Sequence, residues 1–396
     1  MFLELTNTPR DYAWGSATGI AAFLGRPAQG GPEAELWFGT HPGSPARIVR
    51  TVPPTSGVAT LAQWVAENPA QASGNARDTT LPILLKILAA DSPLSLQVHP
   101  TPSQAAAGFA AEEASGIPRD DPARNYRDPY SKPEIIVSVS DRFEALSGFR
   151  PAHEVAELMA DLDVNSIDDA QPLRTLLADP TRVIDALTWL LSGDPRVSAC
   201  VAGITAFAET PVAASTPLAS TYATITELAA HYPQDAGVIV AALMNRVSLR
   251  RGECLYAPAG VLHAYLNGVG IELMTASDNV VRGGLTPKHI DTPELTQLLS
   301  SAQGPAHLLD PIGIGPGATS YRPPAPFKLD LFEPGRASIA TSVLRPAIAL
   351  VDGAEICLES DDAAITLTRG GAAFIPANTG ILHISGRGRV WIASAL

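Results

Sequence analysis

The stretch Pro93-Leu94-Ser95-Leu96-Gln97-Val98-His99-Pro100 alternates apolar and polar side chains along its length. Alternation with a period of two is typical of a β-strand, because successive side chains point to opposite faces of the sheet. One face of this strand is apolar, and the other carries a hydroxyl, an amide and an imidazole, spaced about 6–7 Å apart. Buried polar groups cost free energy unless they find partners. We therefore predict that Ser95, Gln97 and His99 line a site, with a metal ion as the candidate ligand.

The composition indicates a globular protein with two or three domains. The chain has 396 residues, of which 46% are hydrophobic and 17% charged. We find neither a run of about 18 uncharged apolar residues nor a signal peptide, so we expect no membrane partner. The cysteines Cys200, Cys254 and Cys357 are odd in number and far apart. This usage fits a reducing cytoplasm and neither a disulfide framework nor a CxxC metal site.

The distribution of charge argues against a nucleic-acid partner. The net charge is −13, and residues 151–240 hold twelve Asp and Glu against three Arg and no Lys. The rest of the chain is almost balanced, so an anionic substrate meets little repulsion there. We interpret the acidic segment as the solvated surface of a helical piece.

The sequence pattern divides the chain into three regions of different predicted secondary structure. Residues 1–150 have short apolar runs between Pro and Gly, which predicts β-structure with short helices at Leu61–Glu67 and Ser103–Ser115. Apolar residues at helical spacing then predict an α-helical segment, with helices at Ala152–Leu162, Gln171–Leu177, Thr181–Leu191 and Thr224–His231. From Val238 onward the pattern again predicts β-structure, beginning with a strand at Val238–Met244. The chain is therefore predicted to be a mainly β framework with a helical insertion.

A faint internal repeat supports two related β units. The segment Gly252–Ala259 is followed by Leu262-His263, and Gly370–Ala377 is followed by Leu382-His383. In each, a Gly precedes a Pro by six positions, which predicts a strand entering a tight turn and a hairpin returning from it. Repetition favours two jelly-roll units. We expect the second unit to be a non-catalytic copy.

Candidate zinc ligands also occur further along the chain. Lys132 and Glu134 share one face of a predicted strand, and His263 follows a Pro-Ala-Gly turn. Together with His99 they offer nitrogen and oxygen ligands, with Gln97 as a weaker fourth. The alternatives are a Lys132–Glu134 pair that closes a barrel end and a purely structural His263. The residues alone leave both open.

A third block surrounds Arg282. Asp278-Asn279 forms a polar turn, and Arg282 precedes Gly283-Gly284. Glycines let a small anion approach the backbone and the guanidinium. The alternative is an ordinary loop arginine paired with Asp278.

Taken together, these blocks resemble the class I mannose-6-phosphate isomerases, also called phosphomannose isomerases. The resemblance rests on blocks in family order at Tyr12–Ser16, Ala34–Pro42, Leu81–Lys86, Gln97–His99, Lys132–Glu134, Ala257–Tyr265 and Ser277–Lys288. One departure is Ser131, where the family commonly has His; we expect the metal site to survive it.

The resemblance implies a fold and a site. It implies a catalytic cupin domain (1–150 plus 239–317), a helical insertion domain (151–238) and a C-terminal jelly-roll domain (318–396). It implies one zinc ion held by Gln97, His99, Glu134 and His263. It implies an active-site arginine, Arg282. The sugar-phosphate pocket would be lined by Trp14, Glu35, Lys86, Ser95, Lys132, Tyr265, Glu272, Asp278 and Lys288.

The implied reaction interconverts mannose 6-phosphate and fructose 6-phosphate through an enediol. Lys132 is our first choice for the proton carrier and Glu272 the second. Arg282 would stabilise the enediolate or help to open the ring, and Lys86, Ser95 and Lys288 are candidates for binding phosphate. We expect a cytoplasmic monomer that serves GDP-mannose biosynthesis.

Two other functions were considered. A non-catalytic sugar-phosphate-binding or regulatory metal-binding cupin would be indicated by loss of a ligand or of Arg282, and the sequence retains them all. A second nucleotide-transferring activity would need a Gly-rich nucleotide-binding domain, which the chain lacks.

Overall fold

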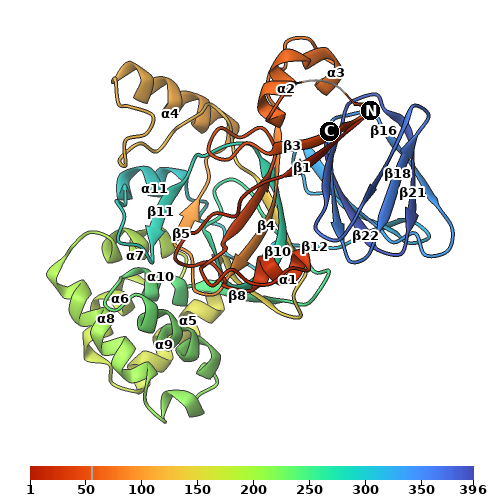
Figure 1. Cartoon of the computed structure of the whole chain (residues 1–396). Coiled ribbons are helices and arrows are strands. Elements are labelled where there is room, and N and C mark those ends of the chain that lie inside the picture. The colour runs from red at the N-terminus through yellow and green to blue at the C-terminus, as the bar shows by residue number, and fades with distance from the viewer. Residues whose placement is uncertain (55–56) are drawn as a thin grey trace.

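The computed structural model describes residues 1–54 and 57–396, and three bodies are visible in it (Figure 1). A sheet-rich centre carries a helical segment on one side and a β-sandwich on the other. The strands are β1 (Phe2–Thr6), β2 (Glu35–Phe38), β3 (Arg47–Val52), β4 (Ile83–Ala90), β5 (Leu96–Val98), β6 (Glu134–Ser138), β7 (Phe143–Phe149), β8 (Met244–Leu249), β9 (Cys254–Ala257), β10 (His263–Thr275), β11 (Val281–Gly284), β12 (Leu308–Leu309), β13 (Ile312–Gly315), β14 (Ala318–Tyr321), β15 (Phe327–Phe332), β16 (Ile339–Val343), β17 (Ala347–Asp352), β18 (Ile356–Ser360), β19 (Ala363–Leu367), β20 (Ala372–Ile375), β21 (Gly380–Gly386) and β22 (Arg389–Ala395).

The helices divide into two sets. Outside the insertion lie α1 (Gly19–Leu24), α2 (Leu61–Glu67), α3 (Pro69–Ser73), α4 (Pro102–Ala114) and α11 (Thr292–Leu298). The helical segment consists of α5 (Ala152–Val164), α6 (Gln171–Leu176), α7 (Val183–Leu190), α8 (Pro195–Ala208), α9 (Ala219–His231) and α10 (Gly237–Ala242), with 3-10 turns at Asp168–Ala170 and Ala213–Ser215. Among the described residues, no helix has both the length and the apolar character that a membrane span requires.

An eight-stranded sheet separates two hydrophobic cores. Its order is β13-β14-β15-β22-β17-β20-β1-β3, so the first strand of the chain joins a sheet made from its last residues. On β17, Ile348 and Leu350 pack into the core shared with the central sheets, while Ala349 and Val351 pack toward the four-stranded sheet β16-β21-β18-β19. A strand buried on both faces reads as a continuous apolar run, and Ala347–Val351 does.

The central sheet uses the same alternation to separate core from site. β10 runs between β4 and β6, where Glu272 is opposite Lys86 and Met274 is opposite Glu134. Ile271 and Leu273 pack into the shared core. Since neighbours along a strand point to opposite faces, Glu272 faces the other way, together with Lys86 and Glu134.

The predicted fold class, mainly β with a helical insertion, is confirmed, but one predicted strand is wrong. Val238–Met244 is instead the helix α10 followed by the first residue of β8. Every residue of α10 is buried, and a helix buried all round has the same continuous apolar sequence as a buried strand. The expected domain boundary between residues 238 and 239 falls inside this helix. Helix α8 was not predicted at all.

The predicted hairpins after the repeated turns are also wrong. β9 pairs with β6 and β12, not with β10, and β20 pairs with β1 and β17, not with β21. The second turn carries the chain from the eight-stranded sheet to the four-stranded sheet, whereas β9 and β10 lie in one sheet with β6 between them. The crossing from β20 to β21 is typical of a jelly roll, in which the chain passes between two packed sheets.

Candidate metal centre and substrate pocket

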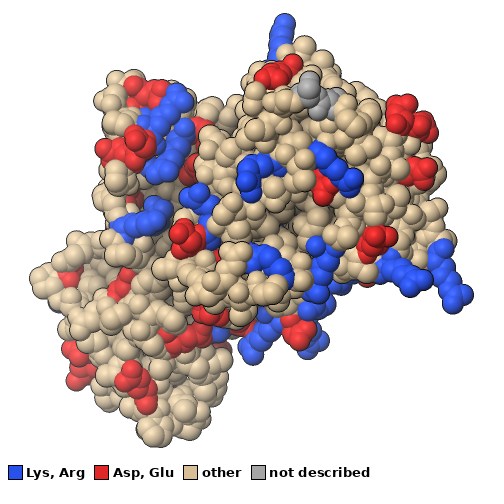
Figure 2. Space-filling view, viewed as in Figure 1, with Lys and Arg blue, Asp and Glu red and all other residues tan. Residues whose placement is uncertain are grey.

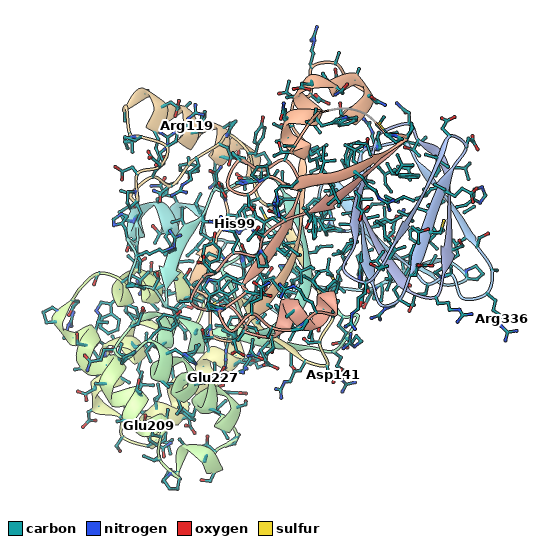
Figure 3. All side chains as sticks on the ribbon, viewed as in Figure 1. His99, Arg119, Asp141, Glu209, Glu227 and Arg336 are labelled. Carbon is teal, nitrogen blue, oxygen red and sulfur yellow. The ribbon has the colours of Figure 1, made fainter. Side chains whose placement is uncertain are left out.

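Three predicted metal ligands lie close together at the ends of strands in the central sheet. His99 directly follows β5, Glu134 begins β6 and His263 begins β10, and one ligand atom from each lies within 4.8 Å of the others. All three residues are fully buried. In Figure 3, His99 lies in the middle of the molecule, between the helical segment and the β-sandwich.

Backbone carbonyls orient the two imidazoles. His99 Nδ1 lies 2.8 Å from the carbonyl oxygen of Asn279, and His263 Nδ1 lies 2.9 Å from that of Val261. A proton on each Nδ1 leaves each Nε2 lone pair directed at Glu134. His263 Nε2 is 3.1 Å from Glu134 Oε1, and His99 Nε2 is 3.4 Å from Oε2. The Tyr265 hydroxyl donates to Oε1 at 2.9 Å.

The charge states of these groups suit a divalent cation. Burial, helped by the Lys132 ammonium, lowers the pKa of His99 to about 3, so this imidazole stays neutral. Burial alone would raise the pKa of Glu134, but the Lys132 ammonium and the polar contacts with both imidazoles hold it well below its ordinary value. A neutral imidazole and an ionised carboxylate are the forms in which histidine and glutamate bind zinc. The donor set therefore fits zinc.

Gln97 lies beside this triad. It is opposite His263 on β10 and opposite Arg282 on β11. Opposed residues on adjacent strands point to the same face, so the Gln97 amide is on the side of the His263 ring. Within residues 1–54 and 57–396, its side chain makes no hydrogen bond. It is therefore available to a metal or to a substrate.

Lys86 stands in a buried cluster of opposite charge. Its Nζ is 2.7 Å from Glu272 Oε2 and 3.7 Å from Glu35 Oε1, and it lies 4.9 Å above the Trp37 ring. Burial alone would lower the pKa of Lys86, but the two carboxylates raise it, so it stays charged. Burial raises the pKa of Glu272, and Lys86 opposes that shift.

A pocket of about 600 Å³ opens above the triad. It is lined by every predicted site residue outside the triad, namely Trp14, Glu35, Lys86, Ser95, Gln97, Lys132, Tyr265, Glu272, Asp278, Arg282 and Lys288. The Lys132 Nζ reaches the floor of the pocket, where it contacts Glu134 and lies 3.2 Å from His99 Nε2. The structure thus brings the predicted residues to one place.

Asp278 has a different partner from the one considered for it. Its Oδ2 is 3.2 Å from Nε2 of His41, and no ion pair between Asp278 and Arg282 occurs in the described part of the chain. His41, which we had not singled out, is buried with its ring against Trp37. Arg282 is left without an ion-pair partner among these residues. Burial and the nearby Arg127 guanidinium lower its pKa.

Sequence reasoning missed several pocket residues on loops. Arg127 and Tyr12 line the pocket, and Tyr232, which follows α9, contributes a wall from the helical segment. The Tyr232 hydroxyl donates to the carbonyl oxygen of Pro93 at 2.6 Å, just before the strand that carries Gln97. These residues have no periodic pattern around them. The only sequence feature that could have indicated them is an aromatic or basic residue between turn-forming residues, as in Asn125-Tyr126-Arg127-Asp128.

Comparison with known proteins gives a consistent result. Residues 2–152 match the family described as phosphomannose isomerase type I, catalytic domain. Mannose-6-phosphate isomerase of Salmonella typhimurium is 33% identical over 98% of both chains, and that of Homo sapiens is 30% identical over 94% of this chain and 92% of its own.

Solved structures agree with these sequence matches. The Salmonella typhimurium enzyme, bound to its substrate fructose 6-phosphate and to zinc, superposes with a TM-score of 0.86 at 32% identity, covering 100% of this chain and 99% of that one. A structure of mannose 6-phosphate isomerase bound with zinc and yttrium gives 0.89 at 32% identity and the same coverage. The chain belongs to the type I phosphomannose isomerase family.

Proposed function

We propose that this chain is a zinc-dependent isomerase that interconverts mannose 6-phosphate and fructose 6-phosphate. The observation that carries the proposal is the buried His99–Glu134–His263 set, which Lys132 joins to a pocket that also presents Arg282. The Salmonella typhimurium relative, whose structure covers the whole chain, binds zinc and its substrate, fructose 6-phosphate.

The zinc would be held by His99, Glu134 and His263, with Gln97 as the fourth ligand. When bound, zinc acts as a Lewis acid that polarises substrate oxygens. The Tyr265 hydroxyl would fix the rotamer of Glu134 through the hydrogen bond to Oε1. Trp14 and Ser95 line the pocket, and Ser95 directly precedes β5. Both side chains would contact the sugar.

Proton transfer between C1 and C2 would fall to Lys132. Its amine is the closest basic group to the triad that also lines the pocket. Glu272 is the second candidate, but its carboxylate is engaged by Lys86. Arg282 would donate to the oxygens that become negative in the enediolate, because its guanidinium has no carboxylate partner within the described residues.

The chain is proposed to divide into a catalytic unit of residues 1–150 plus 239–317, an insertion of residues 151–238 and a C-terminal unit of residues 318–396. We further propose that it acts as a cytoplasmic monomer that supplies GDP-mannose biosynthesis. These statements extend the resemblance and await tests of their own.

Replacing the proposed base gives a direct test of its role. Lys132→Met should lower kcat by about 10²–10⁴-fold, which is the usual contribution of a general acid or base. Lys328→Met is the matched control, because Lys328 pairs with Asp330 on β15, in the eight-stranded sheet. Turnover in D₂O, followed by NMR, reports exchange of the C2 hydrogen. Near-normal exchange in Lys132→Met would assign the proton transfer to another residue.

The activity itself is tested on the purified chain. Fructose 6-phosphate should be converted to mannose 6-phosphate, a chelator should abolish the conversion, and zinc should restore it. A chain that binds both sugar phosphates without converting them would be the non-catalytic cupin considered above. That outcome would refute the proposal.

A further inference from the structure

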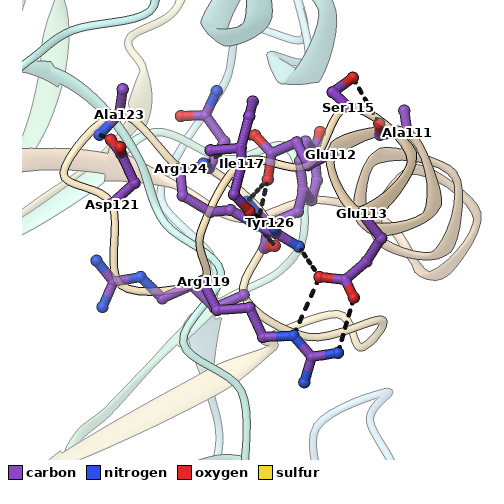
Figure 4. A network of polar contacts seen from close by, with 12 residues as sticks. Ala111, Glu112, Glu113, Ser115, Ile117, Arg119, Asp121, Ala123, Arg124 and Tyr126 are labelled. Atoms are coloured by element: carbon purple, nitrogen blue, oxygen red, sulfur yellow. Dashed lines mark hydrogen bonds and ion pairs between the residues drawn. The ribbon is translucent and has the colours of Figure 1, made fainter.

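The cations of the pocket fall into two groups. Lys86 is neutralised by Glu272 and Glu35, and Lys132 by Glu134. Arg124 also lines the pocket, but its side chain is fully buried and bonds to Glu113 and to backbone carbonyls (Figure 4). These cations therefore have their own protein partners.

The second group has no such partners. Arg127, Arg282 and Lys288 line the same pocket, and none forms an ion pair or a side-chain hydrogen bond with any described residue. They lie close enough to repel one another, since Arg127 contributes, after burial, to lowering the pKa of both Arg282 and Lys288. In Figure 2, Lys and Arg side chains lie among Asp and Glu over the region of α4, β11 and α11, whereas the charged side chains visible on the helical segment are mostly Asp and Glu.

Arg127 is held in place by its backbone. The loop that follows α4 is fixed on one side by Glu112, whose carboxylate accepts from the N–H groups of Asn125 and Tyr126 at 3.0 and 2.8 Å. On the other side, Asn279 Oδ1 accepts from the Arg127 N–H at 2.7 Å. These hydrogen bonds hold the backbone of the loop in place. The position of Arg127 therefore does not depend on a contact made by its side chain.

Asn279 also connects this loop to the metal centre. Its Nδ2 donates to the carbonyl oxygens of Asp128 and Tyr130 at 2.7 and 2.8 Å, and its own carbonyl oxygen orients the His99 ring. One buried residue thus sets the position of Arg127 relative to a metal ligand. The loop of Lys288 is fixed separately, by Asp235 Oδ2, which accepts from the Thr286 N–H at 3.0 Å.

We propose that Arg127 is a substrate-binding residue that, with Arg282 and Lys288, holds the 6-phosphate group, and that Asn279 is the residue that positions it. This proposal rests on the proposed function only for the identity of the substrate. A phosphate dianion offers acceptors to several N–H donors and offsets the mutual repulsion of the three cations. Lys86, a candidate for this role from the sequence, is already neutralised.

The test measures binding separately from turnover. The probe is mannitol 6-phosphate, which has no carbonyl group and cannot isomerise, with mannitol as the uncharged reference, both by calorimetry on the zinc-loaded chain. Arg127→Gln should weaken mannitol 6-phosphate binding at least tenfold, which corresponds to about 1.4 kcal/mol at 25 °C. The KM for fructose 6-phosphate should rise by a similar factor, with less change in kcat.

Two further variants make the result specific. Arg127→Lys should recover most of the affinity, because the charge is kept. Arg119→Gln is the matched control, since Arg119 lies on the same segment but is exposed and pairs with Glu113 away from the pocket (Figure 4). Wild-type affinity in Arg127→Gln, or equal weakening in Arg119→Gln, overturns the assignment. A chain that loses phosphate affinity in Arg127→Gln but never converts fructose 6-phosphate keeps this inference and refutes the proposed function.

Discussion

At the scale of single residues, the site depends on what surrounds Glu134. A buried carboxylate is tolerated only when its charge is compensated, and here Lys132, His99, His263 and Tyr265 all contact it. Removing the carboxylate would leave Lys132 as an uncompensated buried cation. The same residues therefore serve the stability of the folded chain and the binding of metal.

The four proposed ligands differ in strength. An amide oxygen is a weaker zinc ligand than an imidazole, and Gln97 is only half-buried whereas His263 is fully buried. Gln97→Ala should therefore reduce zinc affinity less than His263→Ala does, and His263→Ala should leave little bound zinc. Competition with a chromogenic chelator measures both affinities. Equal losses would show that Gln97 is a ligand of the same rank.

The candidate ligands could be named from local patterns, such as the alternation around Gln97 and His99 or the turn before His263, but their convergence was implied only by the family resemblance. Arg127 and His41 could not be named in this way. Arg127 lines the pocket because Asn279, far along the chain, fixes its backbone, and His41 adjoins the pocket because it contacts Asp278. Contacts between distant loops leave no periodic signal in the sequence.

At the scale of elements, the loop of residues 125–131 is held by Glu112 at its start and by Asn279 over the rest. Asn279 is fully buried and bonds to backbone groups of Arg127, Asp128 and Tyr130. Asn279→Ala leaves these groups unpaired, at a cost of about 1–3 kcal/mol for each one that stays buried. Amide hydrogen exchange over this loop should accelerate at least tenfold. Asn165→Ala, which removes a single bond at the end of α5, should leave exchange in the loop unchanged; acceleration there by both variants would contradict a specific role for Asn279.

Helices α2 and α10 show what helical periodicity can and cannot predict. Helix α2 begins and ends where the sequence predicts, at Leu61 and Glu67, because one face is apolar and Thr60 caps it. Helix α10 has no polar face and was predicted as a strand. The repeated turns were located correctly, but strand pairing depends on which sheet each strand joins, and that is a property of the whole fold.

At the scale of the whole molecule, each body contains one cysteine. Cys200 lies in α8, Cys254 in β9 and Cys357 in β18. Burial raises the pKa of the Cys200 thiol to about 12 and raises that of Cys254 further, which suppresses their reactivity. In the native chain a thiol reagent should therefore label Cys357 first, and the other two only as their bodies unfold. Cys357→Ser should remove the fast phase; equal labelling rates for all three thiols would contradict the packing described here.

Metal binding should stabilise the whole chain, because the triad joins strands from three separate segments. A ligand at about 1,000 times its Kd adds about 4 kcal/mol to the free energy of unfolding when it binds only the folded state. Zinc should therefore raise the Tm, and a chelator should lower it. No change in Tm would contradict binding at a site that only the folded chain forms.

We propose that one zinc ion at His99, Glu134 and His263 makes this chain an isomerase. The most direct measurement titrates the metal-free chain with zinc while following formation of mannose 6-phosphate from fructose 6-phosphate. We expect no activity without metal, a linear rise that ends at one equivalent, and no rise at the same zinc concentrations in His263→Ala. Full activity in the metal-free chain, or wild-type activation of His263→Ala, would contradict this proposal.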